Sequence, residues 1–127
     1  VMLGATDIEA SKKFYDATLG VLGAKPGYKH IGHGGVVRYM YFLDGGTFLI
    51  SEPLDGNSAS HGNGATIGFK AKDTATIDEW HKIGEDNGGV TCEDPPGVRD
   101  GGGMQAYLGY LKDPSGNKIC TMHNIKA

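Results

Sequence analysis

Two stretches of this sequence follow the same plan, 66 residues apart. The offset pairs Asp7 with Asp73, and each aspartate directly precedes a segment whose apolar residues have helical spacing. Aspartate is a favoured helix N-cap, because its carboxylate accepts hydrogen bonds from the free N–H groups of the first turn. The same offset pairs the strand-like residues 1–3 with residues 67–69. The sequence therefore predicts a duplicated unit that begins with a strand and a helix.

Each predicted helix has one apolar face. The first helix, over residues 7–19, places Ile8, Phe14, Tyr15 and Leu19 near one stripe, and the second, over residues 73–83, places Ile77, Trp80 and Ile83 there. Apolar residues at this spacing form the buried side of an amphipathic helix. Glycines follow both segments, as is typical of helix ends. We expect the aromatic residues Phe14, Tyr15 and Trp80 to anchor the core.

Each helix is followed by a strand–turn–strand pattern. Residues 36–43 and 47–51 flank the turn at 44–46 in the first half, and residues 105–111 and 118–122 flank the turn at 113–117 in the second. The first turn consists of Asp and Gly, and the second consists of Asp, Pro, Ser, Gly and Asn, all of which favour tight reversals. Neither helix can bury its apolar face alone, so the two halves should share one core. We expect a single domain with module one at about 1–53, a linker at about 54–63 and module two at about 64–127.

Composition excludes several classes of partner. The net charge of −3 gives no electrostatic footprint for nucleic acid. No apolar run approaches the roughly 18 residues of a membrane span, and no secretory signal pattern is present. Cys92 and Cys120 fit no metal or redox spacing and are expected to be free thiols in a reducing cytoplasm. We therefore expect a cytoplasmic protein with neither a nucleic-acid nor a membrane partner.

Two motifs near the ends of the chain resemble those of one superfamily. Residues 7–20 read D-I-x-x-S-x-x-F-Y-x-x-x-L-G, and residues 113–117 read D-P-S-G-N. In this order they resemble the vicinal-oxygen-chelate superfamily, which includes glyoxalases, bleomycin-resistance proteins and extradiol dioxygenases. The resemblance implies an α+β fold in which two βαβββ modules form a curled mixed sheet with a central cleft, the glyoxalase/bleomycin resistance fold. Such a fold alone does not choose among these activities.

The resemblance also implies where a metal would bind. Its usual ligands, His and Glu, come from the first and last strands of each module. In module two these positions hold Thr66 and Cys120. In module one the first position precedes Val1, and the last falls on Ile50 or Ser51. Because only Cys120 among them readily binds a transition metal, we expect no metal cofactor.

One alternative retains a metal. Glu52, Cys120 and His123 could together form a relocated site, although each has a simpler structural explanation. The cofactor would then be a divalent metal such as Zn, Ni, Mn or Fe. A nucleophilic role for Cys120 would require a nearby base or helix N-terminus that lowers its pKa, and no residue adjacent in the sequence supplies one.

Strand alternation predicts which side chains line the cleft. Residues two apart on a strand face the same way, so Cys120 shares a face with Met122, and Thr66 shares one with Gly68. A glycine-rich loop at 94–103 carries Arg99, which could reach an anionic ligand. The predicted substrate-binding residues, by alternation and by resemblance, are Leu49, Ser51, Thr66, Gly68, Arg99, Tyr110, Cys120 and Met122.

These observations leave three functional hypotheses. The first is a small-molecule-binding protein of the bleomycin-resistance kind that lacks the usual metal site. The second is a metal-dependent lyase or isomerase resembling glyoxalase I (lactoylglutathione lyase), or a related dioxygenase. The third is an interaction domain whose cleft is vestigial. By resemblance we also expect a homodimer.

Overall fold

The computed structural model describes residues 1–126, and its elements follow the predicted duplication. The first half contains β1 (Met2–Gly4), α1 (Ile8–Val21), β2 (Tyr28–Ile31), the short 3-10 helix η1 (His33–Gly35), β3 (Val37–Leu43) and β4 (Gly46–Ser51). The second half contains β5 (Ile67–Lys70), α2 (Thr74–Asp86), β6 (Val90–Thr91), β7 (Gly97–Gly101), β8 (Met104–Lys112) and β9 (Lys118–Lys126). Between β4 and β5, where the linker was predicted, there is neither helix nor strand.

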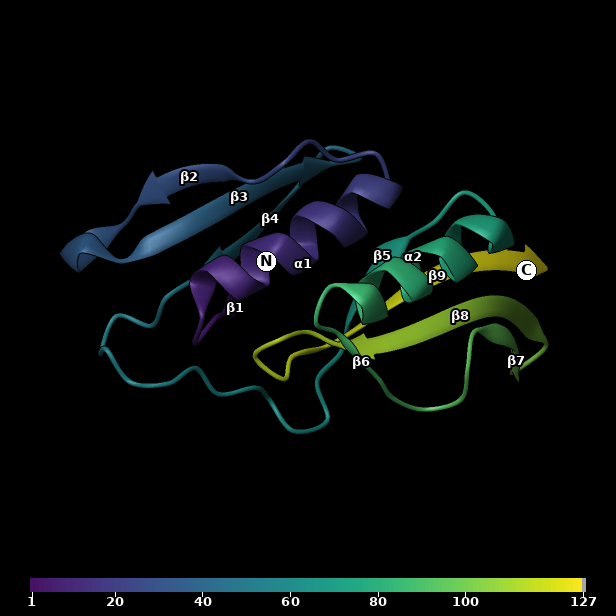
Figure 1. Cartoon of the computed structure of the whole chain (residues 1–127). Helices are drawn as coiled ribbons and strands as arrows, with labels where there is room; N and C mark the ends of the chain where they lie inside the picture. Colours follow the sequence, from purple (N-terminus) through teal and green to yellow (C-terminus); the bar gives the residue numbers. More distant parts are fainter. Residues whose placement is uncertain (127) are drawn as a thin grey trace.

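The strands form two mixed sheets, and each half supplies one of them. The first sheet has the order β1-β4-β3-β2, and the second has the order β5-β9-β8-β6, with β7 also paired to β8. In each sheet the first strand runs parallel to the last, while the remaining pairs are antiparallel. The two helices lie side by side, α1 over the first sheet and α2 over the second (Figure 1). This is the expected α+β architecture, with two separate, unclosed sheets.

Matching hydrogen bonds confirm the internal repeat. Asp7 accepts from the Ala10 N–H at 3.0 Å, and Asp73 accepts from the Thr76 N–H at 2.8 Å. Both aspartates have extended backbone angles, as N-cap residues do. The predicted caps are therefore present at both helix starts, at equivalent positions.

The strand registers are also equivalent. The Ala5 N–H donates to the Ser51 carbonyl at 2.9 Å, and the Ala71 N–H donates to the Met122 carbonyl at 2.9 Å. Ala5 and Ala71 are 66 residues apart, so the two halves join their first strands to their last strands in the same way. Equivalent positions can therefore be identified from the registers themselves.

Both halves contribute to one hydrophobic core. Phe14, Tyr15 and Trp80 are completely buried, as predicted, and they pack with residues of both sheets. In α2 the apolar stripe differs from the prediction, because Ile83 is only half-buried while His81 is buried. The imidazole of His81 is hydrogen-bonded to Thr91 of β6 at 3.1 Å, which explains how a polar side chain occupies this position.

The sequence pattern did not reveal three of the strands. Every residue of β2 is exposed, so this strand lacks the apolar alternation that marks a half-buried strand. The strand β6 has only two residues. The predicted irregular loop at 94–103 instead contains β7, so the second half has one strand more than the expected βαβββ unit.

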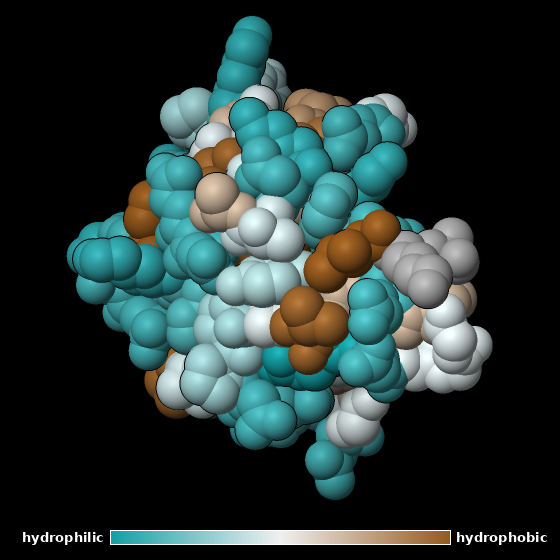
Figure 2. All heavy atoms as spheres, turned by 90° about the vertical axis from the view of Figure 1, so that its right-hand side faces the viewer, coloured by the Kyte–Doolittle hydropathy of each residue, from teal (hydrophilic) through white to brown (hydrophobic). Residues whose placement is uncertain are grey.

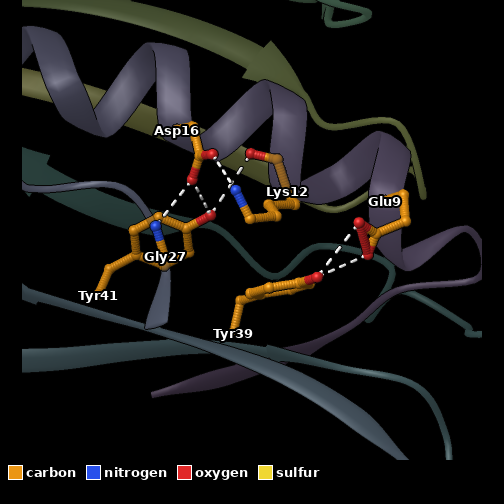
Figure 3. A network of polar contacts seen from close by, with 6 residues as sticks. All are labelled: Glu9, Lys12, Asp16, Gly27, Tyr39 and Tyr41. Carbon is orange, nitrogen blue, oxygen red and sulfur yellow. Dashed lines mark hydrogen bonds and ion pairs between the residues drawn. The ribbon is translucent and has the colours of Figure 1, made fainter. Parts of the chain in front are cut away.

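Hydrogen bonds fasten α1 to β3, as Figure 3 shows. The Tyr39 hydroxyl donates to Glu9 Oε2 at 2.7 Å, and the Tyr41 hydroxyl donates to Asp16 Oδ1 at 2.8 Å. Lys12 forms an ion pair with Asp16 one turn along the same helix. The hydrogen bond to Glu9, together with burial, raises the pKa of Tyr39 to about 12. Both phenols therefore remain protonated donors at neutral pH, and the contacts hold the helix against the sheet.

No helix within residues 1–126 is long and apolar enough to cross a bilayer. The side of the molecule that faces right in Figure 1 is mainly hydrophilic, with hydrophobic side chains in scattered patches (Figure 2).

We expect alanine substitutions at two helix glycines, Gly84 and Gly20, to change the stability of the protein in opposite directions. A Cβ on Gly84 of α2 would lie 2.3 Å from Leu111 Cδ1 and 3.3 Å from Thr18 Cγ2, whereas a Cβ on Gly20 of α1 would meet nothing within 4 Å. We expect Gly84→Ala to lower the free energy of unfolding by about 1–3 kcal/mol through overpacking. Gly20→Ala should raise it by up to about 1 kcal/mol through helix propensity. Urea unfolding measures both changes, and equal effects at the two sites would contradict this packing.

Candidate functional site

Three residues of the second sheet form a row on the face opposite the helices. In register, Cys120 of β9 lies between Gly68 of β5 and Tyr110 of β8. Paired residues on neighbouring strands point to the same side of a sheet. A Cβ on Gly68 would lie 3.4 Å from Cys120 Sγ, so no side chain at this position covers the thiol, although Cys120 as a whole is buried. The structure therefore brings together three of the predicted site residues.

The next row continues the same face. Met122 lies opposite Leu108 on one side and Lys70 on the other. Met122 is 40% exposed, whereas its neighbour Thr121 is completely buried on the helix side, as the alternation predicts. Thr66, directly before β5, is exposed. The face is thus apolar at Met122 and Leu108, with a lysine at its margin.

The thiol of Cys120 and the phenol of Tyr110 are uncharged at neutral pH. Burial is the main cause that raises the pKa of the Cys120 thiol, and the charge of Glu93 adds to it. Burial also raises the pKa of Tyr110, followed by the effects of Cys120 and Glu93. A thiol with a raised pKa is a poor nucleophile. The Cys120–Tyr110 pair can therefore pack against a ligand and hydrogen-bond to it, but it does not provide an activated thiolate.

A cation covers one side of the tyrosine, and sequence reasoning missed it. Lys118 Nζ lies 5.1 Å from the centre of the Tyr110 ring and forms an ion pair with Glu93. Such a cation–π contact favours this orientation of the ring. Strand alternation places Lys118 on this face. The approach of Glu93 depends on its left-handed backbone (φ 57°), which the sequence did not reveal.

Arg99 lies on the same face but not on a free loop. It belongs to β7 and is paired with Ala106 of β8. Its Nη2 donates to the carbonyl groups of Asp94 at 2.9 Å and Pro95 at 3.0 Å. No carboxylate within residues 1–126 pairs with this guanidinium. The glycine-rich loop predicted at 94–103 is thus replaced by a strand that holds Arg99 at the edge of the second sheet.

The two predicted site residues of the first half lie elsewhere. Leu49 and Ser51 are on β4 of the first sheet, and Arg38 Nε donates to Ser51 Oγ at 2.9 Å. Ser51 lines a hollow of about 340 Å³ between this sheet and the linker, together with Met2, Gly4, Arg38 and Glu52. None of the six site residues of the second half lines this hollow. The predicted site residues therefore form two groups, one on each sheet.

The registers correct one predicted equivalence. Gly68 is paired with Cys120, and Met2, its counterpart 66 residues earlier, is paired with Leu49. Leu49, and not Ile50 or Ser51, is therefore the first-half counterpart of Cys120. The error arose because the two hairpin turns differ in length, so an alignment by turn shifts the last strand.

A sequence profile of the Glyoxalase/Bleomycin resistance protein/Dioxygenase superfamily matches residues 1–121, which is nearly the whole chain. The chain belongs to this superfamily. Its fold and its two motifs agree with this membership, which the sequence resemblance had indicated.

Two solved structures show how similar this chain is to other proteins in sequence and in fold. A glyoxalase/bleomycin resistance protein from Albidiferax ferrireducens T118 is 51% identical, with a TM-score of 0.90, over 97% of this chain and 95% of that one. A lactoylglutathione lyase from Agrobacterium tumefaciens is 18% identical, with a TM-score of 0.61, over 96% of this chain and 89% of that one. At that identity the likeness shows the fold alone. A search of curated proteins found no match.

The residues at the three metal positions that lie within this sequence, as the resemblance assigns them, do not fit a metal. In the second half these positions hold Thr66 and Cys120, and the first-half counterpart of Cys120 is Leu49. Leucine has no donor atom, a neutral hydroxyl is a weak ligand, and a thiol binds only after losing its proton. Burial, which raises the pKa of Cys120, makes that loss harder.

The alternative ligands are also not brought together. Glu52 accepts a hydrogen bond from the Val37 N–H at 2.7 Å. His123 alternates to the face opposite Cys120, where its Nδ1 lies 3.3 Å from the Ala71 carbonyl oxygen. Within residues 1–126 no group of three His, Cys, Asp or Glu side chains is placed to hold a metal ion. The relocated set of Glu52, Cys120 and His123 therefore does not form a site in this structure.

Proposed function

We propose that this superfamily member binds a small, partly apolar molecule on the outward face of its second sheet, without the usual metal site. The observation that carries the proposal is the row Gly68–Cys120–Tyr110, which stands where the superfamily would place a metal ligand. A neutral thiol, a phenol and a glycine without a side chain favour contact with a ligand over coordination of a cation.

The surroundings of the row support the same kind of ligand. Met122 and Leu108 offer an adaptable apolar surface, since methionine side chains pack against varied shapes. The Tyr110 ring is held by Lys118 and provides a flat face on which an aromatic or planar group can stack. The positively charged Arg99, at the edge of the sheet, can form an ion pair with an acidic substituent of the ligand. A ligand with a planar body and an acidic group matches these features.

A metal-dependent lyase or isomerase resembling glyoxalase I, or a related dioxygenase, remains the alternative outcome. That chemistry needs a bound divalent ion to polarise the substrate oxygens. No residue pattern on either sheet, within residues 1–126, favours it over metal-free binding. Stoichiometric metal in the purified protein would support it and would contradict our proposal.

A thermal-shift screen tests ligand binding directly. Thiol conjugates, aromatic antibiotics and small aromatic acids should be screened, because a ligand that binds the folded state raises the melting temperature according to its affinity. For each hit, Tyr110→Ala should weaken binding by roughly tenfold, equivalent to about 1.4 kcal/mol. Met122→Ala should weaken it in the same direction.

The matched control is Tyr28→Ala, which removes a tyrosine that is 68% exposed on the first sheet. Binding to this variant should equal binding to the parent protein. A ligand whose affinity is unchanged by Tyr110→Ala, or is lost equally in Tyr28→Ala, would place the binding site elsewhere and overturn the proposal.

A further inference from the structure

A hairpin turn fills the groove at one end of the helix pair. Ser115 Oγ accepts from the Thr6 N–H at 3.0 Å, and Asn117 Nδ2 donates to the Gly4 carbonyl at 2.9 Å. Pro114 Cγ lies 3.5 Å from where a Cβ on Gly88 would stand. The β8–β9 turn is thus wedged between the end of β1, the start of α1 and the end of α2.

Because the two halves repeat the same unit, an equivalent groove lies at the other end of the helix pair. The residues 66 positions away from Gly4 and Thr6 are Lys70 and Lys72, at the end of β5 and just before α2. The corresponding turn of the first half joins β3 to β4 and consists only of Asp44 and Gly45, because β3 ends at Leu43 and β4 begins at Gly46. This two-residue turn is too short to fill its groove as the five residues 113–117 fill theirs.

The unfilled groove is a cavity of about 850 Å³. Its lining comes from the end of α1, the β3–β4 turn and the start of α2, and consists of Val21, Leu22, Gly23, Asp44, Lys70, Ala71, Lys72 and Thr76. Leu22 is the counterpart of Gly88 in the filled groove. The volume lies within the range of small-molecule pockets, about 300–1,000 Å³. Lys70, at the margin of the Tyr110 face, also lines this cavity, whereas the residues proposed above to bind a ligand do not.

The lining combines an apolar wall with an excess of positive charge. Val21, Leu22 and Ala71 supply the wall. Lys70 and Lys72 outnumber Asp44, and within residues 1–126 none of the three takes part in an ion pair. In the filled groove, side chains of the turn satisfy the Thr6 N–H and the Gly4 carbonyl. No turn side chain does the same for the equivalent groups of Lys72 and Lys70 among the described residues.

From this comparison we propose that the cavity is a second ligand site, which takes a small organic anion with an apolar body. The apolar portion lies against Val21, Leu22 and Ala71, and the anionic group lies between Lys70 and Lys72. The site goes beyond the proposed function, because different residues form it and it does not require the Tyr110 face to bind anything.

The test is a fluorescence titration with 8-anilinonaphthalene-1-sulfonate, an apolar aromatic anion. Lys72→Glu should weaken binding of this probe by roughly tenfold, since a repelling charge replaces an attracting one. Lys13→Glu makes the same charge change on the exposed side of α1, away from the cavity lining, and should alter the affinity by less than about twofold. Both lysine variants should also be made in a Tyr110→Ala background, because the probe is an aromatic anion of the kind that the Tyr110 face is proposed to bind, and their difference should persist there.

A second variant fills the cavity by using the protein's own turn. Replacing Asp44-Gly45 with the five residues Asp-Pro-Ser-Gly-Asn should abolish saturable binding of the probe. Weaker binding in Lys72→Glu and loss of saturable binding in the longer turn, with Lys13→Glu unaffected and the same order in the Tyr110→Ala background, would support the site. Absence of saturable binding to the parent protein, or equal weakening in Lys72→Glu and Lys13→Glu, would overturn it. If the longer turn prevents folding, the comparison of the two lysine variants still decides.

Discussion

Trp80→Ala is expected to lower the free energy of unfolding by about 3–5 kcal/mol, the usual loss when a large buried aromatic side chain is truncated. Trp80 is completely buried and belongs to the cluster that both sheets share. Its counterpart in the first half is Phe14, also completely buried. Removing the ring would therefore open a cavity at the centre of the shared core. Denaturant unfolding followed by circular dichroism measures the loss.

Trp80→Phe is the informative companion variant. The indole Nε1–H of Trp80 is buried and has no hydrogen-bond partner within residues 1–126. An unsatisfied buried donor costs about 1–3 kcal/mol, so its removal offsets part of the lost packing. Trp80→Phe should accordingly cost much less than Trp80→Ala. Equal losses in the two variants, or a loss in Trp80→Ala no larger than in the surface variant Tyr28→Ala, would contradict the shared core.

Asp113→Ala should have the next largest effect, about 3 kcal/mol or more of unfolding free energy. The Asp113 carboxylate is only 3% exposed and accepts from the Tyr15 hydroxyl at 2.6 Å. It also accepts from the backbone N–H groups of Ser115 and Asn117 and from the Asn117 side chain. Hydrogen bonds to a charged group contribute about 1.5–3 kcal/mol each, and the substitution would leave buried donors unpaired.

The pair of Tyr15 and Asp113 joins the two halves, because one residue is on α1 and the other begins the β8–β9 turn. Tyr15→Phe removes only one of the hydrogen bonds and should cost less than Asp113→Ala. Chemical unfolding of both variants provides the comparison. A loss under about 1 kcal/mol for Asp113→Ala would show that the turn does not hold the halves together as described.

Much of the fold could be predicted, because local chemistry and periodicity agree. Asp7 and Asp73 cap helices whose apolar residues repeat at helical spacing, and the turn residues mark both hairpins. The strands β2, β6 and β7 escaped prediction for separate reasons. The first is wholly exposed, the second has two residues, and the third begins and ends with glycine. Their pairing depends on the neighbouring strand, which no local pattern encodes.

The candidate site was predictable where alternation alone decides the side chain's direction. Cys120 and Met122 face outward together, and Gly68 and Tyr110 lie in register with the thiol. The predicted first-half counterpart of Cys120 was wrong, because the lengths of the two hairpin turns cannot be compared by alternation. The contact between Glu93 and Lys118 depends on the left-handed backbone conformation of Glu93, which the sequence does not reveal. Nor does the sequence show that Leu49 and Ser51 belong to a different sheet from the other site residues.

The metal content of the purified protein tests the central claim most directly. The full-length protein with its natural N-terminus should be purified without chelators and examined by elemental analysis. The same protein should then be incubated with Zn, Ni, Mn or Fe(II) before dialysis. We predict metal well below one equivalent per chain and no rise in melting temperature on addition of any of these ions. One tightly held equivalent of metal, lost in a Cys120→Ser variant, would contradict the account and support a metal-dependent enzyme.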